Sequence, residues 1–330
     1  MDLRADRLQK INPLLDYFLP KFKEVYKPKR ELSLDESIMP WRGRLCFKVY
    51  NASKINKYGI LIRMVCEATS GYICNFKIYS GQGHRLQDTI LQLLQPYLNI
   101  WHHVYMDNYY NSTDTAELLL WNQVRCCGTI RVNRGLPPIL KNASLQKGQT
   151  KFLRRQDVLL QCWQSKRPVR MITTIHSAEM VESHNIDWVS KEKIWKPICV
   201  VQYNKYMKGV DRADQYLSYF SMVHRTKKWT KRCAMFLINC ALFNAFKVYK
   251  SVKPNSKYKH FLHQTAKYWI KDEDEEVMEE DQQPGTSVSH RRNYDPPQRI
   301  SKDPKKHKLA KIVTGGLKAK PKTMPGLLGA

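Results

Sequence analysis

Several common features are absent from this 330-residue chain, and each absence excludes a class of protein. No stretch reaches the ~18 consecutive apolar residues that a membrane-spanning helix needs, and Met1–Asp6 lacks the apolar segment of a secretory signal. We therefore expect a protein without a membrane partner. The nine cysteines include no Cys-x-x-Cys pair, which argues against a zinc finger or ribbon. We also find no internal repeat.

Acidic residues are scarce compared with basic ones. The chain has 56 Lys and Arg but 29 Asp and Glu, a formal net charge of +27 and a pI near 9.7. Residues 1–271 alone hold 45 Lys and Arg against 19 Asp and Glu, whereas the run 272–281 holds eight acids and no base. The positive charge thus belongs mainly to the part that we expect to fold. This distribution favours a polyanionic partner, above all nucleic acid.

The remaining composition, with 42% hydrophobic and 11% aromatic residues, indicates a folded protein with a sizeable core. Hydrophobic spacing predicts three antiparallel-looking strands, a helix, a strand, a second helix and a further strand, in that order. A mixed α/β sheet with this order is typical of an RNase H-like fold. The predicted ranges are helix 8–26 (interrupted by Pro13 and Pro20), strands 32–37, 60–66 and 72–78, helix 86–99, strand 104–106, helix 113–121 and strand 126–132, with 47–50 as a candidate for a further strand.

Beyond these elements the character of the chain changes twice. Residues 135–196 contain Pro137, Pro138 and alternating apolar positions, which predict a separate, strand-rich element. Helices are expected from Gly209 onwards and across Trp229–Tyr249, the second of them strongly amphipathic. Residues 271–330, first acidic and then rich in Pro, Lys and Gly, are expected to be disordered.

Four aspartates form the first group of candidate functional residues. Asp107 directly follows the buried strand 104–106, Asp35 lies near the end of a short strand, and Asp211 and Asp214 are spaced to share one helical face. Phosphoryl transfer uses divalent ions held by carboxylate oxygens. Taken singly, each acid is better explained as a turn residue, a helix cap or a solvated side chain.

Basic and aromatic residues form the second group. Lys and Arg suit a phosphate backbone, and Tyr109–Tyr110 offer rings on which unpaired bases stack. The alternative is a solvated basic face over core aromatics, which the charge of residues 1–271 makes less attractive. The candidate DNA-binding residues are Arg42, Arg44, Arg131, Arg134, Arg225, Lys227 and Lys228.

Several motifs occur in the order found in one known family. The chain closely resembles the piggyBac transposase family, including its domesticated members in animals, over roughly residues 1–270. The motifs that carry this resemblance are Leu34-Asp35-Glu36-Ser37, Trp41-Arg42-Gly43-Arg44, Lys57-Tyr58-Gly59-Ile60, Met106-Asp107-Asn108-Tyr109-Tyr110, Gly128-Thr129-Ile130-Arg131-Val132-Asn133-Arg134, Tyr203-Asn204, Met207, Gly209-Val210-Asp211-Arg212-Ala213-Asp214-Gln215 and Lys227-Lys228-Trp229.

The resemblance implies a DDE/D transposase that binds Mg²⁺ or Mn²⁺. Asp35, Asp107 and Asp211 match the family's three catalytic acids, and Asp214 matches an additional one. Members nick double-stranded DNA at transposon ends, form hairpins and join the ends to a TTAA target. The implied layout is a helical remnant (1–29), a catalytic RNase H-like domain (30–134 and 197–215), an insertion domain (135–196), a helical DNA-binding or dimerisation segment (216–270) and the tail (271–330).

The chain also departs from the family pattern. Typical members have about another hundred residues before the segment that starts here, and a cysteine-rich zinc-binding domain after the point where this chain stops. Two hypotheses follow. One is a metal-dependent transposase or its truncated catalytic core. The other is a catalytically silent, domesticated DNA-binding protein. Both imply a nuclear location and allow a homodimer.

Overall fold

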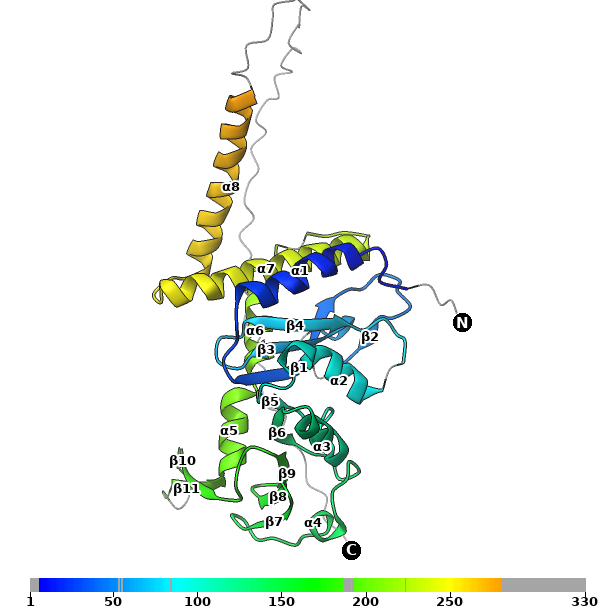
Figure 1. Ribbon diagram of the computed structural model, residues 1–330, viewed down its shortest axis with the longest axis vertical. Coiled ribbons are helices and arrows are strands. Elements are labelled where there is room, and N and C mark those ends of the chain that lie inside the picture. The colour runs from blue at the N-terminus through cyan, green and yellow to red at the C-terminus, as the bar shows by residue number, and fades with distance from the viewer. Residues whose placement is uncertain are drawn as a thin grey trace, which may run out of the picture. The chain divides into compact units, whose positions relative to one another are not determined.

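The computed structural model describes residues 6–280 except positions 53, 55, 84, 187–190, 192 and 223. A single mixed sheet of nine strands dominates the fold (Figure 1). Its strands run in the order β2-β3-β1-β5-β6-β9-β8-β7, and β4 pairs separately with β3. Their bounds are β1 Glu31–Pro40, β2 Val49–Tyr50, β3 Tyr58–Glu67, β4 Ile73–Ile78, β5 His103–Met106, β6 Arg125–Thr129, β7 Thr150–Arg155, β8 Val158–Gln164 and β9 Pro168–Thr173.

Helices cover both faces of this sheet, and two further strands form a small sheet of their own, β10 (Met180–Ile186) with β11 (Lys193–Pro197). Within the described residues, no helix is both long enough and apolar enough to cross a membrane. The helices are α1 Asn12–Val25, α2 Leu86–Leu94, α3 Thr113–Trp121, α4 Pro138–Lys141, α5 Ile198–Tyr206, α6 Gly209–Tyr219, α7 Trp229–Val252 and α8 Tyr258–Glu280.

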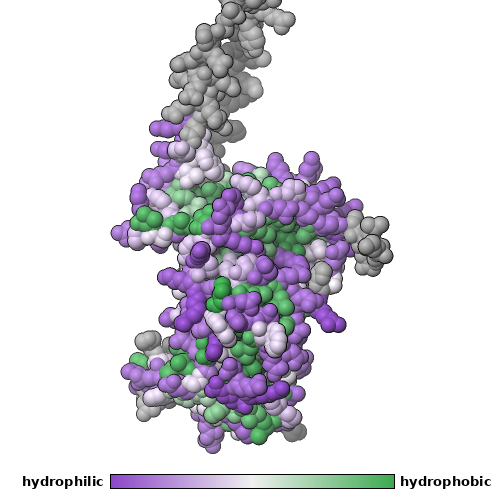
Figure 2. Space-filling model, viewed as in Figure 1, coloured by the Kyte–Doolittle hydropathy of each residue, from purple (hydrophilic) through white to green (hydrophobic). Residues whose placement is uncertain are grey.

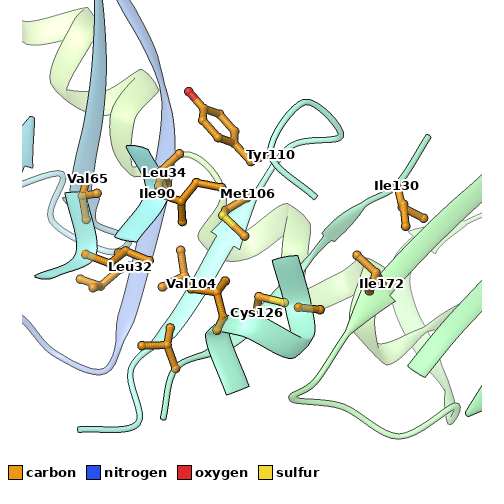
Figure 3. Close-up of a cluster of buried hydrophobic side chains, with 14 of the residues drawn as sticks. Leu32, Leu34, Val65, Ile90, Val104, Met106, Tyr110, Cys126, Ile130 and Ile172 are labelled. Atoms are coloured by element: carbon orange, nitrogen blue, oxygen red, sulfur yellow. The ribbon is translucent and has the colours of Figure 1, made fainter. Parts of the chain in front are cut away.

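Alternation along β1 explains how the two faces are used. Leu32 and Leu34 belong to the core cluster that packs under α2 and α3, together with Ile90, Val104 and Met106 (Figure 3). Each fully buried side chain of this kind stabilises the fold by ~1.5–3 kcal/mol. The intervening positions of β1 face the other side, where α6, α7 and α1 pack (Figure 1). Burial of both faces makes β1 the centre of the molecule.

The part of the sheet formed by β1, β3, β4, β5 and β6 matches the strand order expected from the sequence. β1, β3 and β4 pair antiparallel, and β1, β5 and β6 pair parallel. Several boundaries differ from prediction, and the two largest changes near the candidate acids are in β1 and α2. β1 extends to Pro40, which places Asp35 in the middle of a ten-residue strand and not near its end. The helix predicted to reach residue 99 ends at Leu94 and continues as a 3-10 turn, Gln95–Tyr97, because Pro96 has no N–H to donate.

The segment 135–196 differs more from expectation. β9 pairs antiparallel with β6, and β8 and β7 follow it, so the first part of the segment continues the main sheet. It is not a separate sheet, because β6 presents an edge that β9 completes. The domain boundaries drawn from the resemblance stay a prediction. Residues 271–280, expected to be disordered, belong to α8, and the rest of the predicted tail lies outside the described residues.

Candidate active site

Asp35 and Asp107 lie at neighbouring positions of two parallel strands. The register pairs Leu34 of β1 with Met106 of β5, so each aspartate is the next residue along its chain. Both line one cavity of about 740 Å³. Asp35 reaches it from inside a strand, whereas Asp107 reaches it from the carboxyl end of β5, where α/β sheets collect ligands.

The turn after β5 holds Asp107 through backbone contacts. The Asp107 Oδ1 atom accepts the N–H of Tyr109 at 2.8 Å, as in an Asx turn. The buried side-chain amide of Asn111 then donates to the carbonyls of Met106 (2.9 Å), Asp107 (3.0 Å) and Thr129 (3.0 Å). These bonds tie the ends of β5 and β6 together, so the carboxylate is fixed by the fold.

α3 starts directly after this turn. Ser112 caps it, because its hydroxyl oxygen accepts the N–H of Thr115 at 3.0 Å. Gly128 of β6 allows the close approach of the turn, since a Cβ atom there would lie 1.8 Å from the Met106 carbonyl oxygen. Position 128 therefore requires glycine.

α6 brings Asp214 onto the same face of β1. Ser37 donates a short hydrogen bond to Asp214 Oδ1, and alternation along β1 places Asp35 on the face of Ser33 and Ser37. The helix can approach because it begins with Gly209, where a Cβ atom would lie 2.1 Å from Ser33 Oγ. Because Ser33 and Gly209 are small, α6 packs closely enough on β1 to bring the Asp214 carboxylate next to Ser37.

A lysine neutralises part of this negative charge. The Lys54 Nζ atom lies 3.7 Å from Asp35 Oδ2 and donates to the carbonyl of Glu36 at 2.7 Å. Its charge also opposes the rise that burial causes in the pKa of Asp214. Lys54 therefore partly offsets the negative charge of two of the candidate metal ligands.

Burial nevertheless dominates the electrostatics of the three acids. It raises the pKa of Asp35 to about 7, against the opposing charge of Lys54. It raises the pKa of Asp214 to about 6, against the hydrogen bond from Ser37. It also raises the pKa of Asp107. Positive charge from the protein therefore balances these three buried carboxylates only in part. This is expected of carboxylates that bind a metal cation.

Neither Asp211 nor Asp214 lines the cavity. Asp211 lies exposed in the first turn of α6 and affects the site through its charge, which adds to the rise in the pKa of Asp214. In the part of the chain that the structure describes, no three His, Cys, Asp or Glu side chains are grouped closely enough to hold a metal ion. The structure therefore joins Asp35 and Asp107 and places Asp214 beside Ser37, while Asp211 stays apart.

One of the predicted DNA-binding residues belongs to the acidic cavity. The Arg131 Nε atom donates to Asn108 Oδ1 at 2.9 Å, and its guanidinium lies 6.0 Å from the centre of the Tyr109 ring. Arg131 lines the cavity beside the acids. It is the predicted arginine best placed to meet a phosphate there.

The other predicted basic residues are distributed elsewhere. Arg42, Arg225 and Lys227 line a second cavity, near the start of α7. Arg44 and Lys228 are exposed and Arg134 is half-buried, and none of these three lines either cavity. The structure thus separates the predicted basic set into distinct places.

Sequence reasoning missed Arg63, Lys54 and Glu36 as parts of the site. Arg63 pairs with Glu36 across β1 and β3, and its guanidinium lies 5.5 Å from the Tyr79 ring centre. All three charged residues line the acidic cavity. A signal for Arg63 existed, because it is the single charge inside the apolar run Ile60–Cys66. Lys54 lies in a loop without any such pattern.

Comparison with known proteins shows which family the chain belongs to. A family model described as Transposase IS4 matches residues 1–246. The chain belongs to this transposase family. Among curated relatives, the human PiggyBac transposable element-derived protein 3 is 24% identical over 268 residues, covering 75% of this chain and 45% of the human protein. The human PiggyBac transposable element-derived protein 2 is 22% identical over 267 residues, covering 74% and 45%.

The fold of the chain is also similar to that of a solved transposase structure. The chain aligns with a cryo-EM structure of a piggyBac transposase synaptic complex with hairpin DNA, at a TM-score of 0.68 and 26% identity. The match covers 77% of this chain and 55% of the solved one. It confirms the RNase H-like fold with a mixed sheet. This chain spans about half the length of the relatives that it matches.

Proposed function

We propose that this chain is a metal-dependent DNA transposase or the catalytic core of one. The observation that carries the proposal is the placement of Asp35 and Asp107 side by side on parallel strands, in one cavity, with Arg131 at its rim. Membership of the transposase family supports it. The proposed reaction is nicking of double-stranded DNA, hairpin formation at transposon ends and joining to a TTAA target.

The donor set suits a divalent cation such as Mg²⁺ or Mn²⁺. Asp35, Asp107 and Asp214 offer hard carboxylate oxygens, which these ions prefer, and burial leaves the acids short of positive charge. When bound, such an ion activates the attacking oxygen and neutralises charge on the leaving one. The family pattern implies Asp211 as the third catalytic acid and Asp214, one helical turn away, as the additional one.

The chain's own residues then position the substrate. Arg131, fixed by Asn108, presents a guanidinium that pairs with a phosphate oxygen. Arg63 supplies a second cation at the same cavity, held between the Tyr79 and Tyr109 rings. Lys54 neutralises Asp35 in the absence of a cation, so we expect it to move toward the phosphate when a cation binds.

The biological setting is also a proposal. The net charge of residues 1–271 supports a DNA partner, as does the solved neighbour, a piggyBac transposase complex with hairpin DNA. A homodimer and a nuclear location fit a protein that joins two DNA ends in a chromosome. The run Lys305-Lys306-His307-Lys308 is a candidate import signal.

A second function has its own supporting observation. Lys54 already pairs with Asp35, and Asp211 is exposed, away from the cavity. A protein that has kept DNA binding but lost catalysis would show this arrangement. The alternative is therefore a silent, domesticated nuclear DNA-binding protein.

Strand cleavage separates the two. The full chain is incubated with Mg²⁺ or Mn²⁺ and labelled duplexes that carry TTAA beside candidate terminal repeats, and nicked and hairpin products are resolved. We expect product that disappears with Asp107→Asn and persists with Asp157→Asn, which removes an exposed acid far along the chain. DNA binding without product would favour the silent alternative.

A further inference from the structure

A second cavity, lined by different residues from the acidic one, lies between the end of β1 and the start of α7. Its volume is about 840 Å³. Among the described residues, no Asp or Glu lines it. Its charged lining residues are all cations, namely Arg42, Lys57, Arg225, Lys227 and Arg232.

The start of α7 adds to the positive potential of this cavity. The 24-residue helix has Lys228 at its N-cap, no side-chain cap and no acid in its first turn. Free N–H groups at a helix N-terminus attract anions, and basic residues there oppose the helix dipole. Lys231 and Arg232 nevertheless occupy the first turn. A bound anion would turn this unfavourable arrangement into a favourable one.

Two hydrogen-bond donors at the cavity have no acceptor in the protein. The Trp41 Nε1 and Arg232 Nε atoms are buried without a partner, and the Trp41 residue is only 7% exposed. Buried donors are rarely left unpaired, since the missing bond is costly. Gly43 packs directly on the indole, where a Cβ atom would lie 2.5 Å from a ring carbon, so the residue nearest the indole has no side chain that can supply the acceptor.

We propose that this second cavity is a phosphodiester-binding subsite for one strand of the DNA substrate, with Trp41 and Arg232 as its neutral and charged donors. The inference rests on the proposed function in taking DNA as the substrate. It adds a named site, and two residues, Trp41 and Arg232, outside the basic set predicted from the sequence. Phosphate contacts of this kind set the register of the DNA on the protein and carry no base sequence.

The position along β1 predicts which phosphate is bound. Pro40, which lines the second cavity, lies five positions after Asp35 on β1, and a strand rises ~3.3 Å per residue, giving about 16 Å. One strand of B-DNA advances 3.4 Å along the axis per nucleotide. The subsite therefore holds a phosphate within about five nucleotides of the one that is cleaved.

Binding measured in EDTA tests the subsite without any cleavage. Anisotropy titrations of the full chain on a labelled TTAA duplex compare wild type with Trp41→Phe, which removes the N–H and keeps a ring. We expect affinity to fall about tenfold, as for loss of a hydrogen bond to a charged group. Trp163→Phe is the matched control, because Trp163 Nε1 is also buried without a partner but lies outside this cavity. We expect it to bind as wild type does.

A scan with single methylphosphonates then locates the contact. Neutralising one phosphate, or two adjacent ones, within about five nucleotides of the cleavage point should weaken binding by wild type. The same replacements should have little further effect on DNA binding by the Arg225→Gln variant, because it already lacks one of the cations that line the cavity. Arg225 is exposed, so this variant is expected to fold normally. A flat scan, or equal binding by Trp41→Phe and wild type, would overturn the subsite. If the scan is flat and inorganic phosphate nevertheless competes with DNA, the cavity binds a free anion and not the DNA backbone. That result would also overturn the subsite. Because no metal is present, these results do not depend on whether the protein cleaves DNA.

Discussion

Asp35 occupies a place where negative charge is costly. Its side chain is 16% exposed, and Asp107 lies at the neighbouring position of the next strand. One ammonium group, that of Lys54 at 3.7 Å, offsets only part of the cost, because the pKa of Asp35 stays raised, at about 7. A divalent cation would balance two carboxylates better than one lysine does.

Asp35→Asn should therefore stabilise the metal-free protein while abolishing strand cleavage. At pH 8 in EDTA, removing a buried charge of this kind should raise the free energy of unfolding by ~1–3 kcal/mol. Urea denaturation measures the change, with the exposed Asp157→Asn as a control expected to shift it by less than ~0.5 kcal/mol. Destabilisation by Asp35→Asn would show that the carboxylate is already satisfied inside the protein.

His176 gives a prediction with a defined pH window. Burial lowers its pKa to about 4, from 6.5, and the ring contacts the Thr173 hydroxyl at 3.1 Å. A depressed pKa means that the unfolded chain binds the proton first, so the stability due to the neutral ring is present above pH 6.5 and lost as pH falls toward 4. The loss should reach about 1–3 kcal/mol after allowance for partial exposure.

The measurement is the difference between wild type and His176→Gln in urea denaturation from pH 7.5 to 4.5. Taking the difference cancels the opposite trend of Asp35 and Asp214, whose pKa values are raised. The advantage of wild type should shrink as the pH falls. If the difference in free energy of unfolding between wild type and His176→Gln does not change with pH, titration of His176 does not cause the loss of stability.

At the scale of single residues, the sequence pointed to the candidate acids but not to the residues that surround them. Asp107 was recognisable because it follows a buried strand, and the motifs of the resemblance pointed to Asp35 and Asp214. The ion pair of Lys54 with Asp35 was not predictable, because it depends on how the loop before β3 folds back over β1. The exposure of Asp211 was hidden too, since an i, i+3 spacing does not say which turn of a helix faces the sheet.

At the scale of elements, the contact between α6 and β1 fixes the third carboxylate. A Cβ atom at Gly209 would lie 2.1 Å from Ser33 Oγ and 2.9 Å from the Glu67 carbonyl oxygen. Gly209→Ala should push the helix away from the strand, destabilise the protein by ~1–3 kcal/mol and reduce cleavage by moving Asp214. Thermal denaturation and the cleavage assay measure both effects.

Gly83→Ala is the matched control for this substitution. A Cβ atom there meets nothing within 4 Å, so stability and cleavage should stay close to those of wild type. Adding Ser33→Gly to Gly209→Ala should recover part of the lost activity, because it removes the nearer of the two clashes. No recovery would mean that the Ser33 contact does not set the position of α6.

One helix was predicted to the residue, whereas other elements depended on tertiary pairing. Helix 113–121 matches α3, and Ser112 caps its N-terminus. The union of β7–β9 with the main sheet was not visible, because pairing with β6 joins residues more than forty positions apart along the chain. β1 was predicted too short because Ser37 and Pro40 interrupt its apolar pattern, while pairing with β3 carries the strand through them.

At the scale of the whole molecule, the charge of residues 1–271 predicts how DNA binding depends on salt. A protein that neutralises several phosphates loses affinity steeply as salt rises, with a slope of about 0.9 per phosphate. The tail 282–330 carries eleven Lys and Arg against two acids, and residues 1–271 carry 45 against 19. Deleting residues 282–330 should therefore leave more than half of the slope. A slope that collapses on deletion would place DNA binding in the tail.

Binding of Mn²⁺ tests the central claim most directly, because it does not require turnover. Electron paramagnetic resonance of free Mn²⁺, titrated with the full chain, reports how much ion is bound. We predict binding that is lost in Asp35→Asn, Asp107→Asn and Asp214→Asn and retained in Asp157→Asn. Absence of binding by wild type, or equal binding by all four variants, would contradict a metal site at the end of β5 and favour the silent DNA-binding alternative.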